Sequence, residues 1–230
     1  MRGRYLRRRL AALGGAVVVL VLGVVLGGRA LLMHSDRFQV TDIEVFGPAG
    51  IDPALVREVS GIKPGVPLLA VDLADVQRRV ASIPEVASAL ATRSWPGTVR
   101  LTVAERTPVA LAESPTGPRW VDGTGMAYQA APAGAAPLPR LDATTVAPGD
   151  PATTAGLAVL AALTPQLREK LQVVEASGPA AVTLRLADGK QVRWGSPARS
   201  DRKAAVLGVL LTQRGSVYDV SAPDLPTIRR

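Results

Sequence analysis

One uncharged stretch constrains this chain more than any other feature of the sequence. Residues 10–28 read LAALGGAVVVLVLGVVLGG and contain no charged or strongly polar side chain. As an α-helix that rises about 1.5 Å per residue, this stretch would cover roughly 28 Å, which matches the hydrocarbon thickness of a bilayer. The sequence therefore predicts a transmembrane helix over residues 10–32, preceded by a basic tail at residues 1–9.

Positive charge before this stretch predicts how it crosses the membrane. The tail carries five arginines, and no acidic residue occurs before Asp36. Such an excess of positive charge keeps the N-terminus in the cytoplasm and places the remaining chain outside. A cleaved secretory signal shares the basic start, but its apolar region is usually about 7–15 residues long and ends at a small-x-small site. Residues 29–33, RALLM, contain no such site, so a permanent anchor is favoured.

Composition excludes several classes of function for the rest of the chain. The chain has no cysteine, which excludes disulfides, thiolate nucleophiles and cysteine metal sites. Five of the charges behind the net +8 belong to the N-terminal arginines, and no aromatic residues interleave with the remaining basic ones. Nucleic-acid binding is therefore not expected. About 190 residues follow the anchor, which suits two small domains with aliphatic cores.

Residues 37–108 show the pattern of a small domain that mixes strands and helices. Apolar residues alternate in the strand-like segments and recur every three or four residues in the helix-like ones. The residues 95–97, Trp-Pro-Gly, predict a tight turn between the last two strands. The expected elements, in order, are a strand at residues 37–46 with a bulge near Thr41, helices that begin after Asp52 and Asp72, and strands at residues 86–93 and 98–104.

Residues 109–230 contain two predicted hairpins and two predicted helices. The first hairpin covers residues 119–128, and the second turns at Asp188-Gly189. Leucines at helical spacing from Leu157 to Leu171 predict a helix that Pro165 divides. Another helix is expected from Ser200 to about Gln213, stopped by Gly215 in the left-handed conformation. Shorter extended pieces are expected at residues 138–141 and 216–220.

The first of these domains resembles a known family. Residues 93–110, RSWPGTVRLTVAERTPVA, are similar to the end of the POTRA domain in the division proteins FtsQ and DivIB, as are three upstream patterns. These patterns are Phe38-x-Val40-x-x-Ile43-x-Val45-x-Gly47, Gly65-x-x-Leu68 and Pro84-x-Val86. A basic tail, one transmembrane helix and a POTRA domain are also the layout of that family. The resemblance implies an α+β fold with a β-α-α-β-β POTRA domain at residues 37–108.

The remaining residues resemble the second domain of the same family, which is a mostly antiparallel β domain with flanking helices. The matching pieces are Trp120-x-Asp122-x-x-Gly125-x-x-Tyr128, the Leu186-x-Asp188-Gly189 hairpin with Gly195 and Lys203 after it, and Tyr218-Asp219-Val220. The resemblance implies that residues 109–230 form this domain and end in a partner-binding strand. Members of the family often have a longer, more regular strand after the aspartate near the end, whereas this chain has Pro223 and Pro226, and this departure leaves the length of any terminal edge strand open.

No set of residues in the sequence indicates an enzyme, a cofactor site or a metal site. The only histidine is His34, next to the predicted anchor, and there is no Gly-x-Ser-x-Gly elbow. No phosphate-binding loop occurs, and Gly123-Thr124-Gly125 lacks the third glycine of a dinucleotide site. The carboxylate pairs Asp72 with Asp75 and Glu113 with Asp122 fit roles in caps and turns. We therefore expect a protein without catalytic activity and without cofactors.

The family resemblance implies a scaffold that acts at the division septum. Its implied partners are small coiled-coil division proteins of the FtsB (DivIC) and FtsL type and, through them, the septal peptidoglycan synthase. Strand addition to an exposed sheet edge is the expected mechanism of binding. The opposite interpretation is an edge blunted by Pro223, Pro226 and the two final arginines. The candidate partner-binding residues are Arg202, Val206, Tyr218, Val220, Leu225, Thr227 and Ile228.

Two other functions remain compatible with the sequence. A POTRA-containing envelope adaptor would capture extended clients in the manner of a chaperone, and it would accept many peptides where a scaffold prefers one partner. An anchored enzyme acting on the cell wall is the other alternative. It would need two carboxylates that face a cleft lined for sugar, usually with aromatic side chains. Aromatic residues make up only 3% of this chain.

Overall fold

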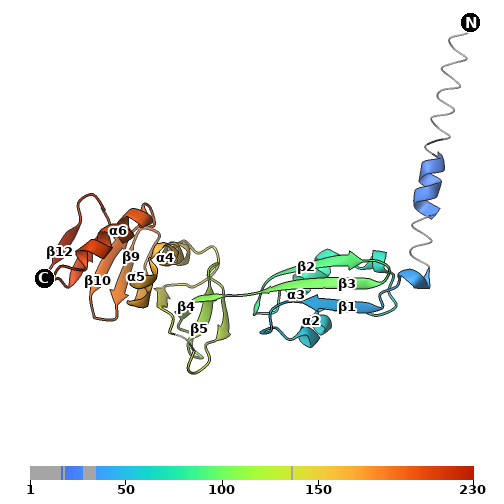
Figure 1. Cartoon of the computed structure of the whole chain (residues 1–230), viewed down its shortest axis with the longest axis horizontal. Coiled ribbons are helices and arrows are strands. Elements are labelled where there is room, and N and C mark those ends of the chain that lie inside the picture. The colour runs from blue at the N-terminus through green and yellow to red at the C-terminus, as the bar shows by residue number, and fades with distance from the viewer. Residues whose placement is uncertain (1–16, 18, 28–34, 136) are drawn as a thin grey trace, which may run out of the picture. The chain divides into compact units, whose positions relative to one another are not determined.

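The computed structural model describes residues 17, 19–27, 35–135 and 137–230 (Figure 1). The chain divides into two compact units, with the boundary between Glu105 and Arg106. Residues 17 and 19–27 are helical, and no helix within the described ranges is both long enough and apolar enough to cross a membrane. The basic tail and most of the predicted transmembrane helix, residues 1–16, 18 and 28–32, lie outside the described residues.

The N-terminal unit has the element order β-α-α-β-β that the sequence predicts. Its sheet has the strand order β1-β3-β2, in which β1 runs parallel and β2 antiparallel to β3. The short 3₁₀ helices η1 and η2 precede β1 and α3. The elements are η1 (Asp36–Phe38), β1 (Asp42–Phe46), α2 (Pro53–Ser60), η2 (Leu68–Ala70), α3 (Leu73–Val80), β2 (Val86–Ser94) and β3 (Thr98–Glu105).

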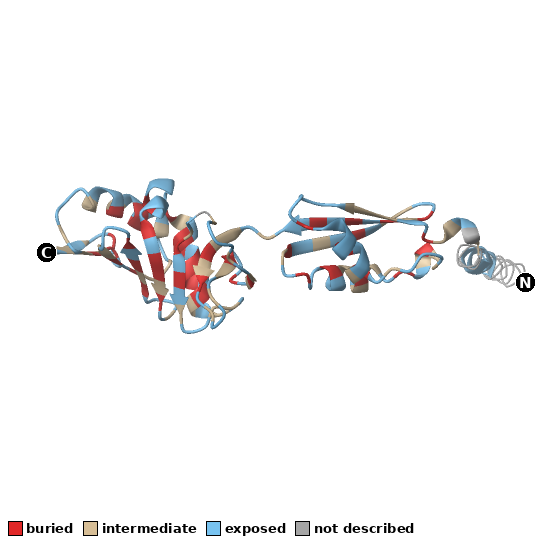
Figure 2. Cartoon of the chain, turned by 90° about the horizontal axis from the view of Figure 1, so that it is seen from below, coloured by how far each residue is buried: buried red, intermediate tan, exposed pale blue. Residues whose placement is uncertain are grey.

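Both helices of this unit begin where the capping residues predict. The Asp52 carboxylate accepts a hydrogen bond from the Ala54 N–H, and the Asp72 carboxylate accepts from the Ala74 and Asp75 N–H groups. Along the strands buried residues alternate with exposed ones, as the red and blue bands of Figure 2 show. The core that results is aliphatic and includes Val56, Val80 and Leu101.

The first strand starts later than its apolar pattern predicts. Residues 36–38 form η1, and β1 begins only at Asp42, so the expected strand from Arg37 with a bulge near Thr41 is wrong. The reason lies in two loops that take the hydrogen bonds of the intervening residues. The Val40 N–H donates to the Val66 carbonyl (2.8 Å), and the Thr41 N–H donates to the Gly97 carbonyl (2.8 Å).

The C-terminal unit is built on one sheet, which has nine strands within the described residues. Their order is β12-β11-β10-β9-β8-β7-β4-β5-β6. Five of the eight pairs described are antiparallel, and the pairs β4 with β7, β7 with β8 and β10 with β11 are parallel. The strands are β4 (Pro108–Ala112), β5 (Arg119–Asp122), β6 (Ala127–Ala130), β7 (Arg140–Ala143), β8 (Leu171–Ala176), β9 (Val182–Leu186), β10 (Gln191–Gly195), β11 (Val217–Asp219) and β12 (Thr227–Arg229).

Within residues 106–135 and 137–230, the helices that accompany this sheet are α4 (Pro151–Ala162), α5 (Pro165–Glu169) and α6 (Ser200–Leu210). Pro165 divides the leucine-rich stretch as predicted, and Thr164 caps the second piece. Leu171 is not helical, however, because it begins β8 next to β7 and β9. The strands β4 and β8 have no counterpart among the elements that the sequence predicts.

The end of α6 also differs from the prediction. The helix stops at Leu210, and Gly215 is not among the glycines with positive φ, so its expected role as a left-handed stop is wrong. Glycine is required there for space. A Cβ at this position would collide with Ile228 Cγ2 and lie 3.3 Å from Tyr218 Cζ.

Candidate functional site

The sheet of the C-terminal unit ends in the hairpin-like pair of β11 and β12. The strand β11 runs parallel to β10 on one side and antiparallel to β12 on the other, with Tyr218 opposite Ile228. Both sides of β11 are therefore occupied. The strand β12 is the last in the described sheet order, so its outer side is open for a further strand. The C-terminal end of the chain is labelled in Figure 1.

Two of the predicted partner-binding residues are enclosed by the chain itself. Tyr218 and Val220 are 0% exposed. The Tyr218 hydroxyl donates to the Gln213 carbonyl (2.8 Å) and the Gly215 carbonyl (3.1 Å), and the Val220 N–H donates to the Arg193 carbonyl (3.0 Å). This corrects the expectation that these side chains contact a partner: they support the edge from within.

The other predicted residues lie at or near the surface. Leu225 is 80% exposed, and Thr227 is exposed on β12. Ile228 turns its side chain toward the core, where it packs over Gly215. Val206 is half-buried against the same core from α6. Of the seven predicted residues, Leu225 and Thr227 are thus the ones that a partner on β12 would reach with least rearrangement.

Arg202 belongs to an ion-pair cluster that holds the loop between β11 and β12. Asp224 in this loop accepts from Arg199 Nη1 (2.7 Å) and from Arg202 Nη2 (2.5 Å), and both arginines lie at the start of α6. The hydrogen bond from Arg199 is the main cause that lowers the pKa of Asp224; burial opposes it, and the charges of Arg202 and Arg199 add to the lowering. The loop that leads into β12 is therefore fastened to α6. The sequence reasoning missed Arg199 and Asp224, because residues 25 apart carry no local pattern that joins them.

Lys203 fixes the start of α6 to the end of β10. It is 1% exposed, and its Nζ donates to the carbonyls of Trp194 (3.0 Å) and Ser196 (2.8 Å). Burial lowers the pKa of Lys203, and the charge of Arg199 adds to this effect. Gly195, which has a φ of +74°, permits the bend that brings these carbonyls together. This arrangement explains why Gly195 and Lys203 occur together in the motif.

We expect Lys203→Met to destabilise the C-terminal unit by about 3 kcal/mol, because two buried carbonyls lose a charged donor. Urea unfolding of the purified chain, followed by tryptophan fluorescence, measures this loss. Lys190→Met is the matched control, since Lys190 pairs with Asp188 at the surface, and it should leave the unfolding midpoint nearly unchanged. Equal midpoints for the two variants would contradict the role of Lys203.

A second buried cluster organises the first strands of the C-terminal unit. Asp122 is 5% exposed and pairs with Arg106 Nη1 at 2.5 Å. The same carboxylate accepts hydrogen bonds from the Thr124 N–H and hydroxyl and from the Met126 N–H. Tyr128, nearby on β6, donates its hydroxyl to the Arg106 carbonyl (3.3 Å). These contacts give Asp122 and Tyr128, two residues of the Trp120 to Tyr128 motif, a structural role.

This cluster predicts an acid dependence of stability. Burial alone would raise the pKa of Asp122, but the hydrogen bonds from Thr124, Arg106 and Met126 outweigh it and hold the pKa below its usual value of 3.8. The folded state thus binds fewer protons than the unfolded state around this pKa. The stabilisation is complete above pH 3.8 and is lost as the pH falls through the folded-state pKa. We expect Asp122→Asn to lower the free energy of unfolding by about 3 kcal/mol at pH 7. In urea unfolding measured from pH 7 to pH 2, the variant should lose less stability at acid pH than the unmodified chain. An equal loss of stability at acid pH in both chains would show that other carboxylates cause it.

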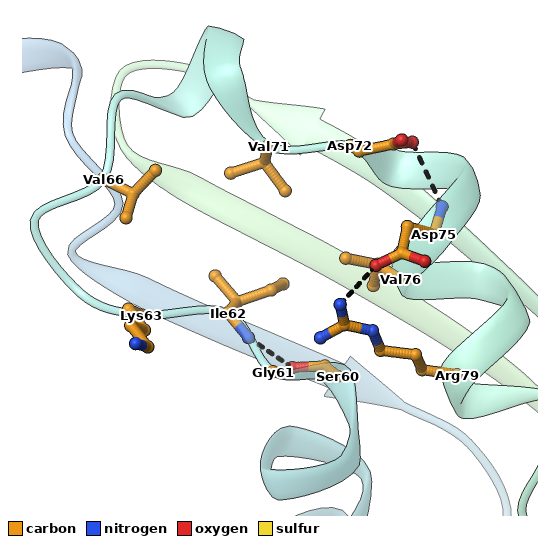
Figure 3. A pocket seen from close by; sticks show the side chains of 10 residues that line it. All are labelled: Ser60, Gly61, Ile62, Lys63, Val66, Val71, Asp72, Asp75, Val76 and Arg79. Atoms are coloured by element: carbon orange, nitrogen blue, oxygen red, sulfur yellow. Dashed lines mark hydrogen bonds and ion pairs between the residues drawn. The ribbon is translucent and has the colours of Figure 1, made fainter.

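The N-terminal unit has a surface pocket of about 190 Å³ between the end of α2 and the start of α3 (Figure 3). Apolar side chains of Ile62, Val71 and Val76 line it. Its carboxylates already have structural partners, since Asp72 caps α3 and Asp75 pairs with Arg79 at 2.6 Å. A larger pocket of about 640 Å³ in the C-terminal unit is lined mostly by prolines, leucines and other apolar residues of β4, α4 and the loop before β7.

Neither pocket brings together the groups that catalysis or metal binding needs. Within the described ranges no three or more histidine, cysteine or carboxylate side chains lie close enough to hold a metal ion. Arg168, which lines the larger pocket, donates a hydrogen bond from its guanidinium to the Leu160 carbonyl (3.1 Å) at the end of α4. His34 lies outside the described residues. The outer strands of the described nine-stranded sheet are β6 and β12, and we take the open edge of β12 as the candidate site because the exposed predicted residues Leu225 and Thr227 lie on or next to it.

The fold and this edge together define a class of protein. A three-stranded β-α-α-β-β unit, followed by a mixed sheet that ends in an open C-terminal strand, makes this a POTRA protein with a second β domain. Family models agree with both parts: residues 38–106 match the POTRA domain of FtsQ type, and residues 110–225 match the C-terminal domain of the cell division protein FtsQ/DivIB. The chain belongs to the FtsQ/DivIB family of cell-division proteins.

Curated relatives carry the same family name along nearly the whole chain. The cell division protein FtsQ of Mycolicibacterium smegmatis is 41% identical over 96% of this chain and 66% of its own length. FtsQ of Mycobacterium tuberculosis strain H37Rv is 38% identical over 96% of this chain and 70% of its own length. FtsQ of Corynebacterium glutamicum is 30% identical over 97% of this chain and 99% of its own length. The chain thus spans about two thirds of the mycobacterial relatives and nearly all of the corynebacterial one.

Proposed function

We propose that this protein is a membrane-anchored scaffold without enzymatic activity that gathers other division proteins at the septum. Its direct partners are small coiled-coil membrane proteins of the FtsB (DivIC) and FtsL type, and through them it is linked to the septal peptidoglycan synthase. The observation that carries this proposal is the open outer side of β12 at the end of a sheet in a chain of the FtsQ/DivIB family.

Strand addition suits this edge because β12 is already held in an extended conformation. Three residues of β12 pair in register with β11, and Ile228 anchors them to the core. The ion pairs of Asp224 fasten the preceding loop to α6. A partner strand would gain main-chain hydrogen bonds without ordering the edge first, while Thr227 and Leu225 would set side-chain specificity.

Anchoring in the membrane is part of the same proposal. It rests on the sequence of residues 10–28, which has the length and apolarity of a transmembrane helix, and on the five arginines before it. The N-terminal tail would then be cytoplasmic and both folded units extracytoplasmic. Concentration of the chain at the septum follows from the proposed partners.

Site-specific photocrosslinking tests the edge directly. We propose to place a photoreactive phenylalanine at Thr227 or Leu225 of the full chain in living cells. The control position is Met126, which is also exposed but lies in the turn between β5 and β6, at the other end of the sheet order. A crosslink to a small coiled-coil membrane protein from positions 225 and 227, but not from 126, is the expected result. Equal crosslinks from all three positions would contradict a site on β12.

The same crosslinks separate the scaffold from the alternatives. One dominant partner supports a scaffold, whereas a smear of many partners at position 227 would favour an adaptor that binds extended clients. Turnover of cell-wall fragments by the purified chain, abolished by a single carboxylate substitution, would instead favour the alternative of an anchored enzyme that acts on the cell wall. A fluorescent fusion that forms no septal band in dividing cells would contradict the proposed localisation.

A further inference from the structure

Two aromatic side chains meet at the end of the POTRA domain where the chain enters it. The ring centroids of Phe38 and Trp95 lie 5.6 Å apart with the planes at 80°, an edge-to-face arrangement. Trp95 is nevertheless 50% exposed. Burial of a large aromatic ring stabilises a protein, and because half of the Trp95 side chain is exposed, about half of this stabilisation is not realised within the domain.

Hydrogen bonds hold this exposed ring beside the segment that enters the domain. The Thr41 N–H and hydroxyl both donate to the Gly97 carbonyl, at 2.8 Å and 3.2 Å. A Cβ at Gly97 would lie against the Gln39 carbonyl oxygen, so only glycine allows this close approach. The turn that carries Trp95 is therefore fixed next to residues 39–41.

Two exposed basic side chains lie at this end of the domain, one on the segment and one on the loop beside it, and the two acidic residues of the segment balance their charge. The Val40 N–H donates to the Val66 carbonyl, and the Gly65 N–H donates to the Val40 carbonyl, which places the loop of Lys63 beside the segment. Lys63 is exposed and makes no ion pair or hydrogen bond among the described residues, and Arg37 is exposed as well. Asp36 and Asp42 are the acidic residues of the segment, and the Asp42 carboxylate accepts from the Ile43 N–H (2.8 Å). We call Arg37, Phe38, Lys63 and Trp95 the entry patch.

The chain length before the entry patch limits its distance from the proposed membrane anchor. Only five residues separate Leu32, at the end of the predicted span, from Phe38. Fully extended, this connection reaches about 20 Å, and the headgroup layer itself is about 5–7 Å deep on each side of the hydrocarbon. Aromatic rings accompanied by Lys and Arg are the side chains that favour this layer, the cations through anionic headgroups.

We propose that the entry patch rests on the outer leaflet, with the Trp95 and Phe38 rings at headgroup depth and Arg37 and Lys63 against anionic lipid headgroups. The inference rests on the proposed membrane anchor and adds to it a second contact with the lipid. The POTRA domain is thereby held at the membrane surface by its own folded residues as well as by its connection.

Quenching of tryptophan fluorescence by brominated lipids tests this contact in the full chain. The chain has three tryptophans, at positions 95, 120 and 194, and none in the predicted span. Trp194 is 0% exposed. The chain is reconstituted into vesicles of phosphatidylcholine and phosphatidylglycerol brominated near the headgroup end of the acyl chains. We expect quenching of the unmodified chain, the same quenching for Trp120→Phe, and its loss for Trp95→Phe.

Two further variants test the orientation and the charge of the patch. Ala87→Trp combined with Trp95→Phe moves the fluorophore to an exposed site at the other end of β2, beside the end of β3, and should restore no quenching. Arg37→Glu combined with Lys63→Glu should reduce quenching of Trp95, as should vesicles without phosphatidylglycerol. Each reconstitution is first floated on a density gradient.

The outcomes distinguish this inference from the anchor on which it rests. If the chain floats with the vesicles but Trp95 is not quenched, the entry patch is wrong and the anchor stands. Quenching that persists in Trp95→Phe, or that is as strong at position 87 as at 95, also overturns the patch. If the chain does not float, the anchor fails and the patch fails with it.

Discussion

We expect Leu101→Asp to unfold the N-terminal unit while the nine-stranded sheet stays folded. Leu101 is 2% exposed in the middle of β3, where it pairs with Val45 of β1 and Ala91 of β2. A carboxylate at this position would be buried without a partner, which costs about 4 kcal/mol or more. A domain of this size has a total stability of only about 5–10 kcal/mol. Hydrogen exchange read by mass spectrometry should show loss of protection confined to residues 35–105.

Thr102→Asp is the matched control for this experiment. Thr102 is the next residue of β3 but is exposed on the opposite face of the sheet, so its carboxylate stays in water. It should leave the exchange pattern close to that of the unmodified chain. Loss of protection in both units of Leu101→Asp would show that the two units do not fold independently.

Removal of residues 221–230 should lower the affinity for the coiled-coil partner by about 100-fold or more. The deletion takes away β12 and with it every main-chain hydrogen bond that a partner strand would form there. Ile228→Pro, which removes one backbone donor from the same edge, should weaken binding to a smaller extent. Co-isolation of the partner from detergent-solubilised membranes measures both effects.

Leu225→Ser serves as the control that keeps the backbone of the edge intact. Leu225 is largely exposed, so this change should leave the sheet folded and test only side-chain specificity. Near-ultraviolet circular dichroism of each variant shows whether the core around Tyr218 and Trp194 is retained. Partner capture that survives the deletion would mean that binding occurs elsewhere, with the scaffold function itself unaffected.

Local patterns predicted the elements whose chemistry is contained in a few neighbouring residues. Asp52 and Asp72 cap helices as expected, and Asp188-Gly189 turns a hairpin, since Gly189 has a φ of +83°. The strands β4 and β8 were missed for the opposite reason. Each has the next strand in the chain, β5 or β9, on one side, but its partner on the other side, β7, is distant in sequence. Leu171 also fits the helical spacing of the leucines before it.

The candidate site was predicted in part, because the sequence located the strands but not the order in which they pair. An extended segment at residues 216–220 gives no sign that a further strand covers it. In the structure β12 does so, which buries Tyr218 and moves the open edge to Thr227, Ile228 and Arg229. Similarly, the pairs of Arg106 with Asp122 and of Arg202 with Asp224 form only once the chain has folded.

The three residues of β12 that pair with β11 bear on how the proposed partner strand would be held. Three residues offer a partner few main-chain hydrogen bonds, and each contributes only about 1 kcal/mol net. A complex formed there alone dissociates readily, so lasting assembly needs a further contact, such as a second copy or a shared membrane plane. On the proposed function, such an edge would suit machinery that assembles at one septum, comes apart when the daughter cells separate and is used again at the next.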